Sequence, residues 1–209
     1  MSHINYVNEK GERYPSATEL TQLLPQPFLW AWYRSSVEKE GWQGWLNNKK
    51  KSDEGMEMGR EVHSLIEGFI AKQPFEGLSG KYESQQIADA LFDKVNPLVT
   101  DWIAIEPHVK SEKLKIHGTA DAIVFMKGKT QVLDWKTSAS KSNTHPVQLA
   151  IYALCYNEKS DLELITTGVI ARVDKKSKGL NVKLDVYDNL KQYYPIVEAL
   201  RTIWSYQNV

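Results

Sequence analysis

The pattern of apolar and polar positions predicts an amphipathic helix in the first half of the chain and a β-hairpin in the second. Over residues 54–72, apolar side chains recur with the i, i+3, i+4, i+7 spacing of a helix that buries one face. Residues 114–125 and 130–136 are rich in β-branched and apolar residues, a composition typical of strands. Lys127-Gly128, between them, has the length of a two-residue hairpin turn.

The same signals assign the rest of the chain. In order, we expect a helical region over 16–72 with turns at Glu40-Gly41 and Ser52–Gly55, a loop over 73–80, a helix over 81–96, strands near 98–111, 114–125 and 130–136, a helix over 146–157, strands near 162–173 and 180–187, and a closing helix over 188–206. Pro146, preceded by a polar cluster, marks one helix entry. Helices before and after a mixed sheet predict one α/β domain over 1–209, with a sheet core at 98–187 and a helical N-terminal elaboration.

Two acidic residues of the hairpin are expected to face each other. If Met126 pairs with Lys129, the ladder places Asp121 opposite Asp134, with Cβ atoms about 5 Å apart. Carboxylates at this distance repel each other, and a shared divalent cation would offset the repulsion. The hairpin 114–136 is therefore a candidate metal site.

A lysine extends this candidate site. Lys136 lies two residues after Asp134 and so on the same face of the strand, while Leu133 and Trp135 point the other way, into a core. Carboxylates that hold a cation, together with an ammonium group that can reach a phosphate oxygen, are typical of metal-assisted phosphodiester hydrolysis. A second Asp-x-Lys copy, at Asp174–Lys176, lies among turn-forming and basic residues, and we interpret it as a solvated hairpin turn.

Residues on two helices are further candidates. Gln148 and Tyr152 are four apart and share a helix face, where they could reach a phosphate or orient the lysine. Alternatively, Tyr152 is a half-buried aromatic residue of the core. His63 lies at the edge of the apolar stripe of 54–72, either as a boundary residue or as a metal ligand.

The order of these motifs resembles the RecB-type branch of the PD-(D/E)XK nucleases. Within that branch the sequence is most similar to the mitochondrial genome maintenance exonucleases and their phage and bacterial relatives. The similarity covers about residues 14–156 and is carried by Tyr14–Thr18, Met58–His63, Gly118-x-x-Asp121, Val132–Ser138, Pro146–Gln148 and Gln148-x-x-x-Tyr152. The chain has Asp rather than Glu at position 134, which is common in this branch. The resemblance implies a restriction-endonuclease-like core.

The resemblance also implies roles for the residues of the site. It implies that Mg²⁺ or Mn²⁺ is held by His63, Asp121, Asp134 and the backbone carbonyl of Trp135, with Glu106, or its rival Glu112, as a further ligand. It implies that Lys136 orients the attacking water and stabilises the charge of the transition state. Gln148 and Tyr152 would support that lysine and the scissile phosphate.

The activity implied by the resemblance is that of a DNA exonuclease in replication, repair or recombination. Its substrate would be single-stranded DNA or DNA with a free end, and a single-strand-binding or recombination protein would be a partner. Two alternatives stay open: a structure-selective or double-strand endonuclease, and a non-catalytic nucleic-acid-binding protein on the same fold. Intact Asp121, Asp134 and Lys136 argue against the last of these.

Composition limits the classes of function and the location that we expect for this protein. The chain has 26 basic and 26 acidic residues, which argues against coating nucleic acid by charge alone. Its single cysteine, Cys155, excludes an intramolecular disulfide and a cysteine-ligated iron–sulfur cluster, and we expect it in the core. The sequence has no long apolar run and no signal-like or Arg-rich amphipathic N-terminus. We therefore expect a cytoplasmic protein, of a bacterial or phage-infected cell, that does not enter membranes.

An aromatic and basic segment is a candidate DNA-binding region. Five large rings lie within sixteen residues, just before a lysine triplet: Trp30, Trp32, Tyr33, Trp42 and Trp45, followed by Lys49, Lys50 and Lys51. Trp42 and Trp45 with the three lysines would stack bases and follow a phosphate backbone. In the alternative interpretation most of these rings fill a helical core. A second basic patch is Lys175–Lys178.

Overall fold

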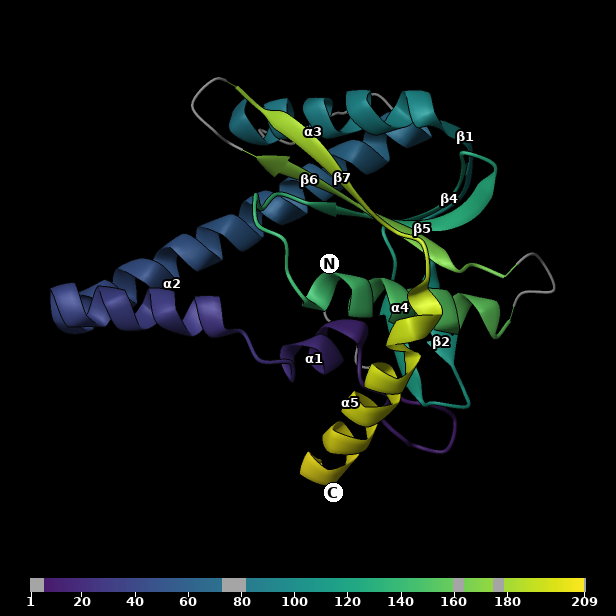
Figure 1. Ribbon diagram of the computed structural model, residues 1–209, viewed down its shortest axis with the longest axis horizontal. Coiled ribbons are helices and arrows are strands. Elements are labelled where there is room, and N and C mark those ends of the chain that lie inside the picture. The colour runs from purple at the N-terminus through teal and green to yellow at the C-terminus, as the bar shows by residue number, and fades with distance from the viewer. Residues whose placement is uncertain (1–5, 73–81, 160–163, 175–178, 209) are drawn as a thin grey trace.

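A five-stranded mixed sheet with helices on both faces forms the centre of the protein (Figure 1). The computed structural model describes residues 6–72, 82–159, 164–174 and 179–208. The strand order is β1-β4-β5-β6-β7, with β5 and β6 parallel and the other neighbours antiparallel. The strands are β1 (Val99–Ile105), β4 (Ala122–Met126), β5 (Lys129–Lys136), β6 (Thr167–Asp174) and β7 (Asn181–Tyr187). The predicted α/β class is confirmed.

Helices cover the two faces of this sheet unequally. The end of α2 (Pro27–Ala71) and α3 (Tyr82–Val95) pack on one face. On the other face lies the largely buried α4 (Thr144–Asn157), with α1 (Ala17–Gln22) and α5 (Tyr194–Gln207) packed against it. Two 3₁₀ turns, η1 (Asn96–Leu98) and η2 (Leu190–Tyr193), lead into β1 and α5. No helix in the described ranges has both the length and the apolar character that a membrane span needs.

Successive side chains of β5 point to opposite faces of the sheet and so enter different cores. Leu133 and Trp135 belong to the core under α2 and α3, whereas Val132 belongs to the core under α4. Asp134 therefore points towards α4, on the face opposite to Leu133 and Trp135, as the alternation along the strand predicts.

The β4–β5 hairpin has the predicted register. Met126 pairs with Lys129, and the ladder continues to Ala122 opposite Leu133. Lys127 and Gly128 have φ of 53° and 75°, and two positive φ angles are what a two-residue turn that matches the twist of its strands requires. Asp121 comes directly before the last pair of the ladder, at the level of Asp134.

The predicted strands over 98–111 and 114–125 are each divided in two, contrary to expectation. Their outer halves form a separate two-stranded sheet, β2 (His108–Ser111) and β3 (Ile116–Thr119). The breaks coincide: Glu106 has φ of 47°, and its amide donates to the Asp121 carbonyl at 2.9 Å. Pro107 has no amide proton to extend a ladder there. This double break places Asp121 at the junction between the two sheets.

The N-terminal helical region contains one of its two predicted turns. Gly41 has a non-helical φ of 60° and ψ of −146° within α2, which confirms the first turn. The turn at Ser52–Gly55 is wrong, because the helix continues through it. A single interior glycine costs a helix only about 1 kcal/mol, which tertiary packing can offset. The predicted loop 73–80 lies outside the described residues.

The two halves of α2 fold back on each other at Gly41. Residues 27–57 thereby form an arm that extends from the body of the protein (Figure 1). Asn48 is buried and donates from Nδ2 to Ser36 Oγ at 2.7 Å. Gly44 lies so close that an added Cβ would be 2.3 Å from the Ser36 carbonyl oxygen. The glycine thus permits the contact between the two halves.

We expect Gly44→Ala to separate the two halves of the arm, because a backbone carbonyl cannot move aside as a flexible side chain can. The expected loss is about 1–3 kcal/mol or more. Gly55→Ala is the matched control: it lies in the same helix with nothing within 4 Å of its Cβ, so it should stabilise the helix by up to about 1 kcal/mol. Chemical denaturation of both variants measures the difference. Equal stability of the two would contradict the packing described.

Candidate active site

A cavity of about 500 Å³ opens where α1, α2, β3, β5 and α4 meet. Six residues singled out from the sequence border it together: His63, Asp121, Asp134, Lys136, Gln148 and Tyr152. The others on its wall include Arg13, Ser16, Thr18, Glu19, Arg60, His117 and Gly118. Residues separated by almost ninety positions in the sequence therefore share one cavity.

His63 brings together a carboxylate and a backbone carbonyl. Its Nδ1 lies 3.2 Å from Asp121 Oδ1, and its Nε2 lies 3.1 Å from the carbonyl oxygen of Trp135. The other Asp121 oxygen accepts a hydrogen bond from the Trp135 amide at 2.7 Å. His63 thus lies in the cavity wall, where it joins Asp121 to the end of β5.

Asp134 and Lys136 form a buried ion pair, with 2.6 Å between Oδ2 and Nζ. The side chain of Asp134 is 2% exposed, and no hydrogen-bond donor in the described ranges is aligned with its Oδ2. The contact with Lys136 is therefore chiefly electrostatic. Burial raises the pKa of Asp134 to about 6, against the opposing effect of Lys136.

His63 and Asp121 stabilise each other's ionised forms. Burial works against the charged form of His63, but Asp121 raises the imidazole pKa to about 9. Burial likewise opposes ionisation of Asp121, yet His63 and Lys136 hold its pKa below the ordinary value. Two carboxylates are thus matched by an imidazolium and an ammonium group.

Gln148 and Tyr152 meet across one turn of α4, as their spacing predicts. Gln148 Nε2 donates to Tyr152 Oη at 2.9 Å. Tyr152 is buried rather than half-buried, and burial raises its phenol pKa well above the usual value, so the hydroxyl keeps its proton. Gly118 makes room for this ring, because an added Cβ would lie 2.7 Å from Tyr152 Cε1.

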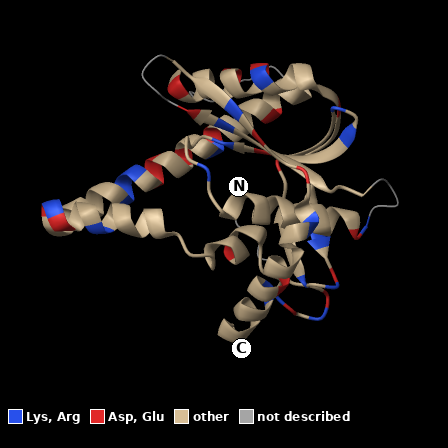
Figure 2. Cartoon of the chain, viewed as in Figure 1, with Lys and Arg blue, Asp and Glu red and all other residues tan. Residues whose placement is uncertain are grey.

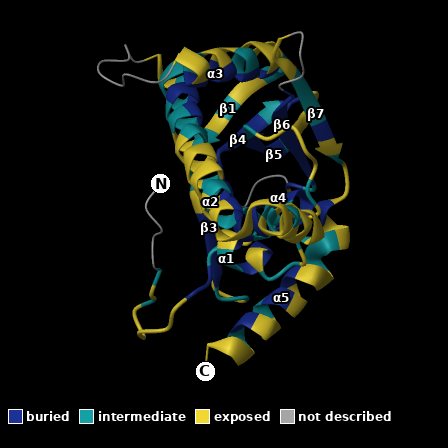
Figure 3. Cartoon of the chain, turned by 90° about the vertical axis from the view of Figure 1, so that its left-hand side faces the viewer, coloured by how far each residue is buried: buried dark blue, intermediate teal, exposed yellow. Residues whose placement is uncertain are grey.

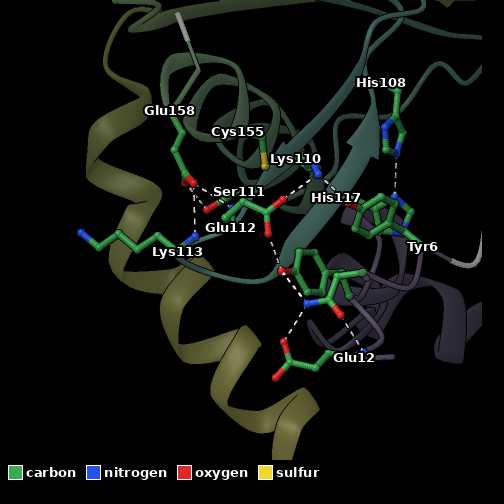
Figure 4. Close-up of polar contacts among 12 residues, drawn as sticks. Tyr6, Glu12, His108, Lys110, Ser111, Glu112, Lys113, His117, Cys155 and Glu158 are labelled. Carbon is green, nitrogen blue, oxygen red and sulfur yellow. Dashed lines mark hydrogen bonds and ion pairs between the residues drawn. The ribbon is translucent and has the colours of Figure 1, made fainter. Parts of the chain in front are cut away.

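The structure separates the rival glutamates Glu106 and Glu112. Glu106 borders a neighbouring cavity of about 340 Å³ together with His63. Glu112 lies on the turn after β2, where it contacts Lys110 and Tyr14 at 2.6 Å each (Figure 4). Glu112 is not among the residues that border either cavity.

A glutamate that the sequence reasoning missed accompanies Glu106. Glu67 borders the same smaller cavity, and burial, followed by its hydrogen bond with Glu106, raises its pKa to about 7. Its position four residues after His63 on one helix face was the signal that could have identified it.

The second Asp-x-Lys copy lies away from this cavity. Asp174 is 4% exposed at the end of β6 and forms an ion pair with Lys183 at 2.9 Å, so its interpretation as a solvated residue is wrong. The hairpin itself is present, since β6 and β7 pair from Asp174 opposite Asn181. Lys175–Lys178 lie outside the described residues.

The aromatic segment is mostly exposed, so the interpretation that its rings fill a core is wrong. Trp30, Trp32 and Trp42 are 73%, 38% and 68% exposed. Trp42 stacks on Trp45 with 4.6 Å between ring centroids. All lie on the arm, much of which is solvent-exposed (Figure 3), and not in the cavity wall. Lys49, Lys50 and Lys51 are also on the arm, which carries both basic and acidic residues (Figure 2).

The family profile of the PD-(D/E)XK nuclease superfamily matches residues 86–202, more than half of the chain. The chain belongs to the PD-(D/E)XK nuclease superfamily. It is 28% identical over 151 residues to mitochondrial genome maintenance exonuclease 1 of Mus musculus, and the match covers 66% of this chain and 43% of that protein. The chain thus spans less than half the length of this relative.

Solved structures give a weaker likeness. The alkaline exonuclease LHK-Exo from Laribacter hongkongensis has a TM-score of 0.47 and 8% identity, and the match covers 93% of this chain and 87% of that chain. A crystal structure of LHK-Exo in complex with dAMP gives 0.46 and 9% with the same coverage.

Members of this superfamily generally depend on a divalent metal ion. Among the described residues, no three His, Cys, Asp or Glu side chains already surround one point suited to a metal. However, Asp121 and the Trp135 carbonyl oxygen both contact His63, and Asp134 Oδ2 is buried without an aligned donor. Two carboxylates, a carbonyl and an imidazole fit Mg²⁺ or Mn²⁺ in donor type.

We expect Gly118→Ala to displace Tyr152 from the cavity wall, because the new methyl group would overlap the ring. The predicted loss of stability is about 1–3 kcal/mol, measured by chemical denaturation. Gly59→Ala is the control, since its Cβ would meet only the Thr137 hydroxyl, at 3.8 Å. If both variants matched the wild type in stability, the close approach of Gly118 to Tyr152 would be disproved.

Proposed function

We propose that this protein is a divalent-metal-dependent DNA exonuclease that hydrolyses phosphodiester bonds and prefers single-stranded DNA, in replication, repair or recombination. The observation that carries the proposal is the meeting of Asp121, Asp134, Lys136 and His63 in one cavity. Membership of the nuclease superfamily supports the reaction class. The similarity to a curated exonuclease supports the exonuclease mode.

Asp121, Asp134 and the Trp135 carbonyl would hold the metal ion, with Glu106 beside them. His63 would become a nitrogen ligand on losing its proton to solvent, because an imidazolium has no lone pair for a metal ion. When bound, Mg²⁺ or Mn²⁺ supplies Lewis-acid stabilisation of negative charge on the phosphate oxygens. Asp121 is the group best prepared for this role, because its low pKa keeps it ionised at neutral pH. The carboxylates are held in place by the Trp135 amide and by Lys136.

Lys136 would act on the reacting phosphate. Burial works against its charge, but Asp134 and Asp121 raise its pKa, so its ammonium group keeps its protons. A protonated ammonium can orient the attacking water and donate to a phosphate oxygen as charge develops. Gln148 and Tyr152 border the same cavity and can donate further hydrogen bonds to the phosphate.

The arm favours a single-stranded substrate. Exposed Trp42 stacks on the partly buried Trp45, and Lys49 Nζ lies 5.5 Å from the Trp45 ring centroid. Within 27–57 the chain has five basic and five acidic residues, so stacking rather than net charge would provide most of the affinity. Unstacked bases are available on single strands and not in duplexes.

We expect Asp134→Ala and Lys136→Ala to reduce cleavage by about 100-fold or more, because each removes a charge next to the reacting phosphate. End-labelled linear single strands, duplexes and circular single strands are incubated with Mg²⁺, Mn²⁺ or EDTA. Wild-type protein should degrade linear single strands with a metal ion and not with EDTA. Circular single strands should remain intact, since an exonuclease needs an end.

Asp174→Asn and Lys183→Ala are the matched controls, since they alter the other Asp-x-Lys copy and its ion-pair partner. Both should keep cleavage activity once folding has been checked by circular dichroism. The nuclease proposal fails if no substrate is cleaved with either metal ion, or if Asp134→Ala and Lys136→Ala remain fully active. Degradation of circles would remove the exonuclease part alone.

We expect Trp42→Ala to weaken binding of a single-stranded oligonucleotide by about 1–3 kcal/mol, the value of one lost stacking contact. Fluorescence anisotropy with a labelled oligonucleotide and with EDTA measures binding without cleavage. Tyr206→Ala is the control, because this ring is 86% exposed but lies on α5. Unchanged affinity in Trp42→Ala would exclude the stacking role proposed for this ring.

A further inference from the structure

Five basic side chains border the cavity with the paired carboxylates, and four of them have partners among the described residues. The partnered ones are Arg13 with Glu19, His63 with Asp121, Lys136 with Asp134, and His117 with His108. The fifth is Arg60. Within the described ranges it has no hydrogen bond or ion pair, and its side chain is exposed.

Arg60 carries a positive charge that forms no ion pair with the carboxylates on the described wall of the main cavity. The three carboxylates on the wall, Glu19, Asp121 and Asp134, are each matched by a cation in direct contact. Arg60 adds a positive charge that none of them compensates. A phosphodiester entering the cavity is an anion, and a guanidinium at the wall that forms no ion pair attracts it.

Arg60 also lies at a distinctive place on α2. It precedes His63 by three residues, about 4.5 Å along the helix axis, and follows Lys51 by nine residues, about 14 Å. It borders both the main cavity and the smaller cavity with Glu67 and Glu106. It is therefore located between the arm and the candidate metal ligands.

We propose that Arg60 is a positioning residue that binds the backbone phosphate next to the scissile phosphate, on the part of the substrate strand that leads to the arm. Lys136 contacts Asp134 and would therefore act on the scissile phosphate. The neighbouring phosphate would then be bound by Arg60. The guanidinium has parallel N–H donors that match two phosphate oxygens. The proposal rests on the proposed nuclease function and assigns the phosphate that the catalytic residues leave without a cation.

A structural role makes different predictions. Arg60 could serve only to offset the charge of Glu67 and Glu106, which hydrogen-bond to each other beside it. Its removal would then change stability and leave substrate affinity unchanged. A phosphate contact instead changes the KM and the salt dependence of binding, because each neutralised phosphate releases counterions.

The test compares the full-length wild type with Arg60→Ala, Arg60→Lys and Lys129→Ala. Lys129 is the control because it is an exposed cation at the opposite end of β5. Steady-state cleavage of a labelled single strand is measured between about 50 and 200 mM salt, and equilibrium binding is measured with EDTA. We expect Arg60→Ala to raise KM about tenfold with little change in kcat, and to reduce the salt slope of binding by about one.

Arg60→Lys should recover the salt slope but only part of the affinity, because lysine restores the charge without the paired N–H donors of the guanidinium. Lys129→Ala should behave as wild type. An unchanged KM and salt slope in Arg60→Ala, with wild-type cleavage intact, would overturn the role of Arg60 and leave the nuclease function standing. If the wild type cleaves nothing, the nuclease function fails, and the salt slope of binding still decides whether Arg60 contacts a phosphate.

Discussion

Two buried carboxylates with like charge, Asp121 and Asp134, are the constraint on which the rest of this structure depends. Burying ionised groups is unfavourable unless partners compensate them. Here His63 and Lys136 provide the compensation, and the Trp135 amide fixes the orientation of Asp121. Because α2 supplies His63 and β5 supplies Lys136, the charge balance of the site ties that helix to the centre of the sheet.

The central sheet keeps these charged groups in a cavity while neighbouring residues of the same strand bury their apolar side chains. On β5, Leu133 and Trp135 fill the core under α2 and α3, and Asp134 points to the α4 side. The break at Glu106 and Asp121 then separates β4 from β3, so that Asp121 sits at the junction of two sheets rather than within a regular ladder. Backbone hydrogen bonds that a ladder would use are satisfied across the break.

Helix α2 joins the candidate active-site cavity to the exposed arm. Its last turns are anchored in the core by Val62, Leu65 and Ile66, while its first half folds back at Gly41 and exposes large aromatic side chains. Exposed apolar groups on a folded protein are unfavourable in water and often mark binding surfaces. Because one helix contains both the arm and His63, a strand bound to the arm would be held in line with the carboxylates.

The sequence by itself determined the local parts of this protein. The hairpin register, the turn at Lys127-Gly128, the shared helix face of Gln148 and Tyr152 and the opposite faces of Asp134 and Trp135 all follow from spacings of a few residues. At this range the backbone periodicity leaves few alternatives. Only the tertiary structure decided the rest. The break at Glu106, the exposure of the tryptophans, the burial of Asp174 and the pairing of Glu67 with Glu106 each depend on contacts between segments far apart in the chain, which local propensity does not specify.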